Sequence, residues 1–115
     1  MDKKILIKPI LKKFKREVKQ INKDNFKRII LFGSYAREDQ TNGSDIDIIL
    51  IFQKEPIAKI KSKIREISNS LSLQYNIVIT EFLFTESEFN KYKTPFLLNV
   101  RKEGIILWKK RLINS

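Results

Sequence analysis

The chain of 115 residues contains neither cysteine nor histidine. Without cysteine it can form no disulfide and no thiolate metal site, which fits a cytosolic protein. Without histidine it lacks the commonest general base and the commonest zinc ligand of proteins. Any acid–base chemistry therefore falls to carboxylates, lysines or tyrosines.

A long apolar run is also missing. Near the N-terminus Lys3 and Lys4 precede the apolar residues 5–7, but Lys8 and Pro9 end that run at once. This is far shorter than a signal-peptide core or a membrane span. We therefore expect a soluble protein that works in the cytoplasm and contacts no membrane.

Acidic residues are scarce beside basic ones: 13 Asp and Glu stand against 24 Lys and Arg, a formal net charge of +11. Much of the excess lies in residues 1–28. One interpretation is an electrostatic platform for nucleic acid, nucleotide or an acidic partner protein. The other is a lysine-rich, solvated helix face. We weigh them about evenly and do not favour nucleic acid, because exposed aromatic residues are not interleaved with the basic ones.

Hydrophobic patterns predict one domain over residues 1–115, with a mixed α/β sheet, helices on one face and a cleft on the other. Residues 1–26 are assigned to a basic amphipathic N-terminal helix. Residues 27–84 are assigned to the core strands and helix. Residues 85–115 are assigned to C-terminal helices and a tail.

Local signals place the ends of these elements. Pro9 suits the first turn of a helix, Thr85 and Glu88 are typical of a capping box, and Gly104 is a helix stop. The expected helices cover 9–22, 34–40, a segment from 56, and two pieces after 85 separated near Pro95; the expected strands cover 27–32, 44–52, 75–84 and 105–108.

The most informative pattern joins a Gly-Ser pair to two carboxylates. Gly33 and Ser34 follow the apolar run 29–32, and ten residues later Asp45 and Asp47 flank an isoleucine at the start of a second run. Side chains alternate along a strand, so the two acids share a face. Two neighbouring acids suit Mg²⁺, which completes its octahedron with waters and substrate phosphates. A Gly-Ser turn offers phosphates a close backbone, N–H donors and a hydroxyl. The pattern predicts a metal–nucleotide site.

These residues resemble the signature of the minimal nucleotidyltransferases of the DNA polymerase beta superfamily: Gly-Ser, a ten-residue spacer, then Asp-x-Asp. The segment 35–37 (Tyr-Ala-Arg) and Ser44 fit the same signature. The resemblance is sharpest over residues 29–51 and implies the nucleotidyltransferase fold. A weaker similarity continues through 75–79, 85–89, 95–96 and 102–105.

The resemblance implies nucleotidyl transfer at a two-ion Mg²⁺ site, with the ions about 4 Å apart. Asp45 and Asp47 are then the metal ligands and catalytic acids. Gly33 and Ser34 hold the β- and γ-phosphates of ATP or another nucleoside triphosphate, and Ser44 buttresses the acids.

Arg37 has two interpretations of nearly equal weight. Its guanidinium matches phosphate oxygens in a fork, which makes it a candidate clamp on the nucleotide. Alternatively, it forms an ion pair with Glu38 or Asp39.

The family usually carries a third carboxylate on the next strand, and the similarity places it at Asn76. An amide oxygen can bind a metal, but it accepts no proton at neutral pH. Glu81 lies five positions further on, and a regular strand turns it to the opposite face. The replacement of the family's third carboxylate by Asn76 bears on catalytic turnover and leaves nucleotide binding untouched.

Single-domain members of the family resemble the antitoxin half of toxin–antitoxin pairs, beside an all-helical ribonuclease toxin of the HEPN class. The resemblance implies transfer of AMP from ATP to a tyrosine of that toxin. The alternative is a binding module of the same fold that neutralises its partner by docking. A homodimer is the default prior for a small soluble protein.

Overall fold

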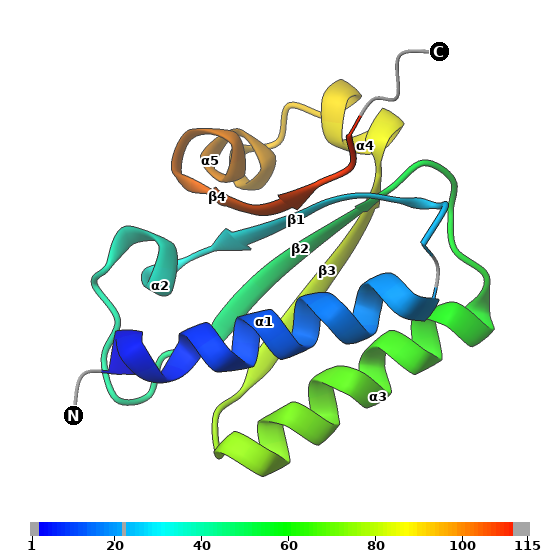
Figure 1. Cartoon of the computed structure of the whole chain (residues 1–115). Coiled ribbons are helices and arrows are strands. Elements are labelled where there is room, and N and C mark those ends of the chain that lie inside the picture. The colour runs from blue at the N-terminus through cyan, green and yellow to red at the C-terminus, as the bar shows by residue number, and fades with distance from the viewer. Residues whose placement is uncertain (1–2, 22, 112–115) are drawn as a thin grey trace.

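The computed structural model describes residues 3–21 and 23–111, and Figure 1 shows how their helices and strands are arranged. A four-stranded sheet lies between helices that come from both halves of the chain. In chain order the elements are α1 (Lys3–Ile21), β1 (Phe26–Phe32), α2 (Ser34–Arg37), β2 (Ile46–Phe52), α3 (Ala58–Tyr75), β3 (Ile79–Thr85), α4 (Glu86–Lys91), α5 (Pro95–Glu103) and β4 (Ile105–Lys109).

The sheet has the strand order β3-β2-β1-β4, which puts β2 and β1 in the centre. β1 pairs antiparallel with β2 and β4, whereas β2 and β3 are parallel. Central β2 is covered on both faces, and its residues 48–52 are all buried. A strand buried on both sides reads as a continuous apolar run, as this one does. The expected mixed α/β sheet is confirmed.

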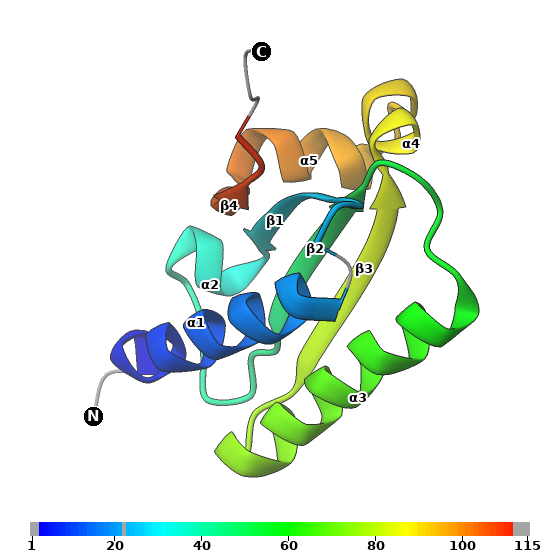
Figure 2. The same cartoon turned by 45° about the vertical axis from the view of Figure 1, so that its right-hand side comes forward.

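Helices α1 and α3 cover one face of the sheet, where Phe14, Ile48 and Ile64 belong to the larger core cluster. Figure 2 shows α4 and α5 on the other side. There Phe89 and Leu97 pack over β2 in a second, smaller cluster. The expectation of helices on one face only was therefore wrong. The apolar residues of α4 and α5 need a partner surface, and the second face of β2 supplies it.

The first helix begins earlier than its proline suggests. α1 starts at Lys3, so Pro9 is its seventh residue, not part of its first turn. A proline inside a helix removes one backbone hydrogen bond and typically costs about 3 kcal/mol. Burial of Ile7, Ile10 and Phe14 against the sheet offsets that cost.

The boundary between α3 and β3 also differs from expectation. α3 runs through Tyr75, and Asn76 is its C-cap in the left-handed conformation, with φ 53°. Asparagine tolerates that conformation better than most residues. The hydroxyl of Ser72 donates to the carbonyl of Ser68 (2.7 Å) and accepts from the N–H of Ile79 (3.2 Å). It thus ties the end of the helix to the start of the strand.

The remaining local signals can be compared directly. α2 ends at Arg37, earlier than expected, because Glu38 adopts a left-handed C-cap with φ 64°. The capping box is confirmed: Thr85 N–H donates to Glu88 Oε1 (2.8 Å), and Glu88 N–H donates to Thr85 Oγ1 (3.1 Å). Gly104 ends α5 as expected, and β4 lies at the sheet edge. Within the described ranges, no helix is both long and apolar enough to cross a membrane.

Candidate active site

Gly33 joins the end of β1 to the start of α2. Its φ of 81° and ψ of −155° belong to a region that residues other than glycine rarely adopt. A β-carbon at this position would lie 2.4 Å from Oδ2 of Asp47. The backbone of Gly33 is therefore packed directly against the Asp47 carboxylate. The Gly-Ser turn and the acid pair, separated in the sequence, meet at one end of the sheet.

Asp45 and Asp47 flank the first residue of β2. Asp47 is half-buried and Asp45 is exposed. Burial raises the pKa of Asp47, the charge of Asp45 raises it further, and Arg37 lowers it. The ionised form of Asp47 is therefore under-compensated by the protein itself. A divalent cation between two such oxygen ligands would supply the missing charge.

The single turn of α2 holds the Gly-Ser pair in place. The carbonyl of Gly33 accepts hydrogen bonds from the N–H groups of Ala36 (3.0 Å) and Arg37 (3.1 Å). Ser34 is the first helical residue and is half-buried beside the acids' end of the sheet. Tyr35 is buried in the larger core, and burial raises the pKa of its phenol. Tyr35 thus serves packing.

Arg37 makes the ion pair that one of its two interpretations foresaw. Its Nε lies 3.0 Å from Asp39 Oδ2, and its Nη1 lies 3.5 Å from Glu103 Oε2 at the end of α5. These carboxylates raise the pKa of Arg37. The guanidinium stays partly exposed and close enough to influence Asp47 electrostatically. A role on phosphate would require it to exchange or share these partners.

Ser44 braces the loop that leads into β2. Its hydroxyl accepts a hydrogen bond from the N–H of Thr41 (2.8 Å), and its own N–H donates to the carbonyl of Thr41 (3.1 Å). This reciprocal turn fixes the backbone immediately before Asp45. The position agrees with a buttressing role, exerted through the loop.

Asn76 does not lie on the strand beside the acids. It caps α3, with an exposed side chain, before β3 begins. It does share with Ser44 and Asp45 the lining of a hollow of about 350 Å³. The expectation that Asn76 lies on the third strand was therefore wrong, because α3 runs through Tyr75 and β3 begins at Ile79.

The residue of β3 level with the acids is Thr80. In the parallel pairing of β2 with β3, Asp47 lies opposite Thr80 and Ile48 lies opposite Glu81. Thr80 therefore points to the face of Asp47, and it is half-buried there. Its hydroxyl can bind a metal but carries no charge. Sequence reasoning did not consider this position, because only the register of β3 against β2 brings it level with Asp47.

Glu81 faces away from the site, as the alternation along a strand predicts. Its side chain is 6% exposed and pairs with Arg65 of α3 at 2.6 Å. No group of three or more acidic residues that could hold a metal is found among the described residues. Two carboxylates and a hydroxyl still fit Mg²⁺, because that ion usually takes few protein ligands and keeps waters and phosphates.

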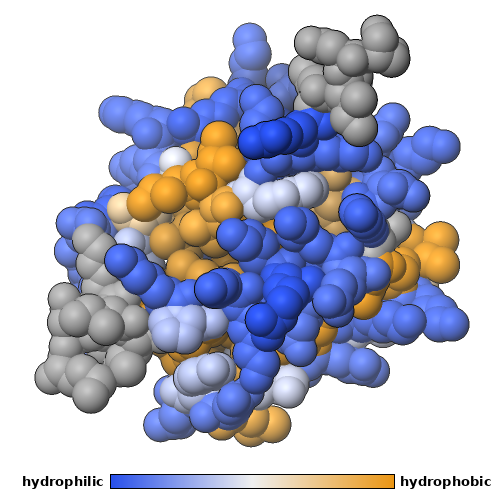
Figure 3. Space-filling view, in the orientation of Figure 1, coloured by the Kyte–Doolittle hydropathy of each residue, from blue (hydrophilic) through white to orange (hydrophobic). Residues whose placement is uncertain are grey.

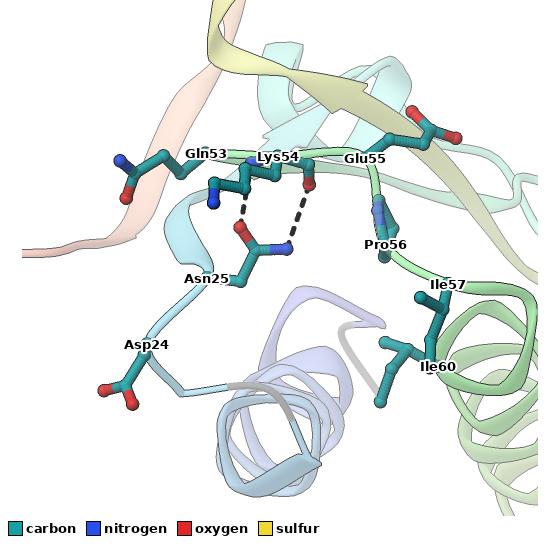
Figure 4. Close-up of a pocket in the computed structure, with 8 residues that line it drawn as sticks. All are labelled: Asp24, Asn25, Gln53, Lys54, Glu55, Pro56, Ile57 and Ile60. Atoms are coloured by element: carbon teal, nitrogen blue, oxygen red, sulfur yellow. Dashed lines mark hydrogen bonds between the residues drawn. The ribbon is translucent and has the colours of Figure 1, made fainter.

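A second hollow lies at the opposite end of β2, about 20 Å along the strand from the acids. Its volume is about 560 Å³, and Figure 4 shows the residues that line it. Asn25 spans the loop there: its Nδ2 donates to the carbonyl of Lys54 (2.9 Å), and its Oδ1 accepts from the Lys54 N–H (2.8 Å). These two hydrogen bonds tie the turn before β1 to the loop after β2.

At one end of the sheet a strained glycine thus lies against a half-buried carboxylate, with a second acid beside it. Residues 11–107 match the nucleotidyltransferase domain family. The chain therefore belongs to that family and is a nucleotidyltransferase. The resemblance to its minimal members, noted from the Gly-Ser and Asp-x-Asp residues, is confirmed.

Individual relatives agree with this assignment. A protein of Methanocaldococcus jannaschii, provisionally named a protein adenylyltransferase, is 38% identical over 96 residues, which cover 84% of this chain and 93% of that protein. A toxin–antitoxin structure with AMP-PNP matches with a TM-score of 0.61 and 20% identity, over 85% of this chain and 73% of the other. A complex of a tri-AMPylated Shewanella oneidensis HEPN toxin with an MNT antitoxin matches with a TM-score of 0.52 and 17% identity, over 87% and 73%. The two structural likenesses establish the fold.

Proposed function

We propose that this protein transfers AMP from ATP to a hydroxyl of a partner protein with the help of Mg²⁺, and that the partner is a HEPN-type toxin which the modification silences. The observation that most directly supports this proposal is the packing of the Gly33 backbone against the carboxylate of Asp47, with Asp45 beside it. This is a place where triphosphate and two acids would meet.

In this proposal Asp45 and Asp47 hold the metal, which supplies charge neutralisation at the phosphates when bound. The N–H groups around Gly33 and the hydroxyl of Ser34 hold the β- and γ-phosphates. The acceptor oxygen forms a bond to the α-phosphorus, and the bond from that phosphorus to the bridging oxygen breaks, so pyrophosphate leaves. The hydroxyl proton passes to water. On β3 the residue level with Asp47 is Thr80, which cannot act as a carboxylate base.

The relatives support the chemistry and the class of acceptor. One carries the provisional name of a protein adenylyltransferase, and the structural neighbours include toxin–antitoxin complexes, one with AMP-PNP and one with an AMPylated toxin. We place the activity in the cytoplasm and assign it to residues 1–115 as one unit.

The test mixes the protein with its candidate toxin, ATP and Mg²⁺, and follows pyrophosphate release together with AMP on the toxin by mass spectrometry. The double variant Asp45→Asn/Asp47→Asn should lose both signals. The matched control Asp24→Asn/Glu55→Gln removes the same charge at the far end of β2 and should retain them. Equal activity of the two double variants would refute the assignment of the acids.

A second function is favoured by one observation, the neutral Thr80 level with Asp47. A site without a third charged ligand suits a binding module that neutralises its partner by docking. The double variant also separates these functions. If it still neutralises the toxin in growth assays, docking suffices; if neutralisation disappears while the complex still forms, transfer is required.

The edge of the sheet offers a contact face for a protein partner. Leu98 on α5 and Ile105 and Ile106 on β4 are 47%, 45% and 55% exposed, and Figure 3 shows a hydrophobic area over the place of these elements. We propose that this face meets the toxin, with a second copy of the chain as the alternative. Ile106→Lys should weaken the complex in size-exclusion chromatography with light scattering, and the same runs report any homodimer.

A further inference from the structure

The exposed flank of α1 carries a concentrated positive charge that nucleotidyl transfer does not use. A hollow of about 430 Å³ on this helix is lined entirely by basic residues and one glutamine. Figure 3 shows the hydrophilic area that crosses the molecule where Figure 1 places α1 in front. We call it the α1 groove; its residues are Lys12, Lys15, Arg16, Lys19, Gln20 and Lys23.

The charge is specific to this flank of the helix. On the side of α1 that meets α3, another hollow is lined by Glu17 and Glu66 together with Lys63. Cations are balanced by carboxylates there, whereas the α1 groove has no acidic residue in its lining. Positive charge is therefore concentrated on the flank of α1 that forms this groove.

The fold also brings an aromatic ring to the groove from the far end of the sequence. Trp108 of β4 is half-buried, and Lys19 Nζ lies 4.8 Å from the centre of its ring. The ring of Phe26 supports Trp108 edge-on at 6.4 Å. Lys110 Nζ, which donates to the carbonyl of Asp24 at 3.1 Å, adds a cation nearby. The absence of aromatic neighbours had counted against nucleic acid in the sequence, and the structure removes that objection.

The spacing fits a phosphate backbone. α1 ends at Ile21, and from Lys12 to Gln20 it rises about 12 Å, which is enough for its cations to reach more than one phosphate of a single strand. Cores of protein–protein interfaces are poor in lysine, so a lysine-lined groove is a weak candidate for a protein partner. A basic groove beside a half-buried tryptophan is the arrangement by which single strands are bound through phosphates and base stacking.

We propose that the α1 groove binds single-stranded nucleic acid, with the five cations on the phosphates and Trp108 stacking on a base that displaces Lys19 from the ring. This binding site lies outside the acid pair, and it stands or falls independently of the transfer reaction.

The test titrates the 115-residue protein with a labelled single-stranded RNA and with the corresponding duplex, between about 50 and 200 mM salt, by fluorescence anisotropy. Trp108 is the single tryptophan of the chain, so its own fluorescence reports contact at the groove. We expect RNA to quench it with the same midpoint as the anisotropy change. Binding without quenching would place the RNA elsewhere and overturn the proposal.

The groove variant is Lys12→Gln/Lys15→Gln/Lys23→Gln, which spares the lysine over Trp108. Its affinity for the single strand should fall at least tenfold at 100 mM salt. The slope of log affinity against log salt should become shallower by about 2, since each phosphate contact on a single strand contributes about 0.7.

The matched control is Lys59→Gln/Lys61→Gln/Lys63→Gln, which removes the same charge from α3. Its affinity should stay within about twofold of the wild type. Equal losses in both triple variants would mean that net charge alone attracts RNA, and equally effective competition by polyglutamate would mean a general polyanion surface. Preference for the duplex would remove the stacking role of Trp108. Each of these results would overturn the proposal.

Discussion

The two ends of strand β2 are built for different purposes. At its C-terminal end Phe52 is fully buried, and its ring lies 4.5 Å from that of Phe26. At its N-terminal end the half-buried Asp47, with a raised pKa, is pressed against a glycine in an unfavourable conformation. The Phe52 end is well packed. The Asp47 end keeps polar, strained contacts that do not serve packing. We therefore expect stability and function to be separable along a single strand.

The largest expected effect comes from breaking the packed end. Phe52→Ala should lower the free energy of unfolding by about 3–5 kcal/mol, because it removes a large buried ring and leaves a cavity. Urea denaturation measures the loss, and nucleotide binding by the molecules that remain folded should be unchanged. Ile57→Ala is the control: Ile57 is 66% exposed and should change stability little. A loss of nucleotide affinity equal to the loss of stability would contradict the separation.

At the strained end, Gly33→Ala should affect stability and function together. The substitution forces a β-carbon into a positive-φ position and to within 2.4 Å of Asp47 Oδ2, and such strain costs about 1–3 kcal/mol. ATP binding in the presence of Mg²⁺, measured by calorimetry, should also fall sharply. Gly43→Ala is matched, because a β-carbon there meets nothing within 4 Å. Similar results for the two alanine variants would show that the close approach is unimportant.

A negative charge added beside Asp47 sharpens the comparison between the two ends of β2. Thr80→Asp should tighten Mn²⁺ binding at least tenfold in calorimetry, since a unit charge about 4 Å from a cation is worth several kcal/mol at an effective dielectric constant near 20. Asn76→Asp is the control, because Asn76 caps a helix and is not level with Asp47. A larger gain from the change at position 76 would refute the register argument.

Thr80 also shows where sequence reasoning reached its limit. The Gly33 turn and the acids were foreseen because short-range chemistry, a spacer of known length and alternation along a strand specify them. The residue of β3 level with Asp47 is Thr80, and only the pairing of β3 with β2 reveals it. The strand was expected to begin four residues too early, at Tyr75. Local apolar alternation after Tyr75 suggested a strand, but α3 continued to that residue.

The same limit applied to the helices. Pro9 was read by its local preference for a first turn, whereas burial of the residues around it extends α1 through the proline. The second layer formed by α4 and α5 was missed because it depends on which face of β2 remains uncovered. Boundaries and layers that tertiary packing decides were thus less predictable than caps, such as Thr85 with Glu88, which are decided within a few residues.

The smallest expected effect concerns Asp47 itself, and its sign is opposite to that of the stability changes expected for Phe52→Ala and Gly33→Ala. Because burial and Asp45 raise its pKa, folding favours the protonated form of Asp47. Its contribution to stability is therefore fully present below the ordinary carboxyl pKa of 3.8 and is lost as pH rises through the higher folded value. Asp47→Asn should then be more stable than wild type at neutral pH, by about 0.5 kcal/mol, the scale of a partly exposed site. The gain should vanish below pH 3.8, because both side chains are then uncharged. Thermal unfolding of the two proteins across pH, without and with Mg²⁺, measures this difference. The other carboxylates are the same in both proteins, so their contributions to stability cancel. Added Mg²⁺ should stabilise the wild type and leave Asp47→Asn unchanged; a variant that is less stable at neutral pH would show that the Asp47 carboxylate supports the fold and is not a strained group kept for ligand binding.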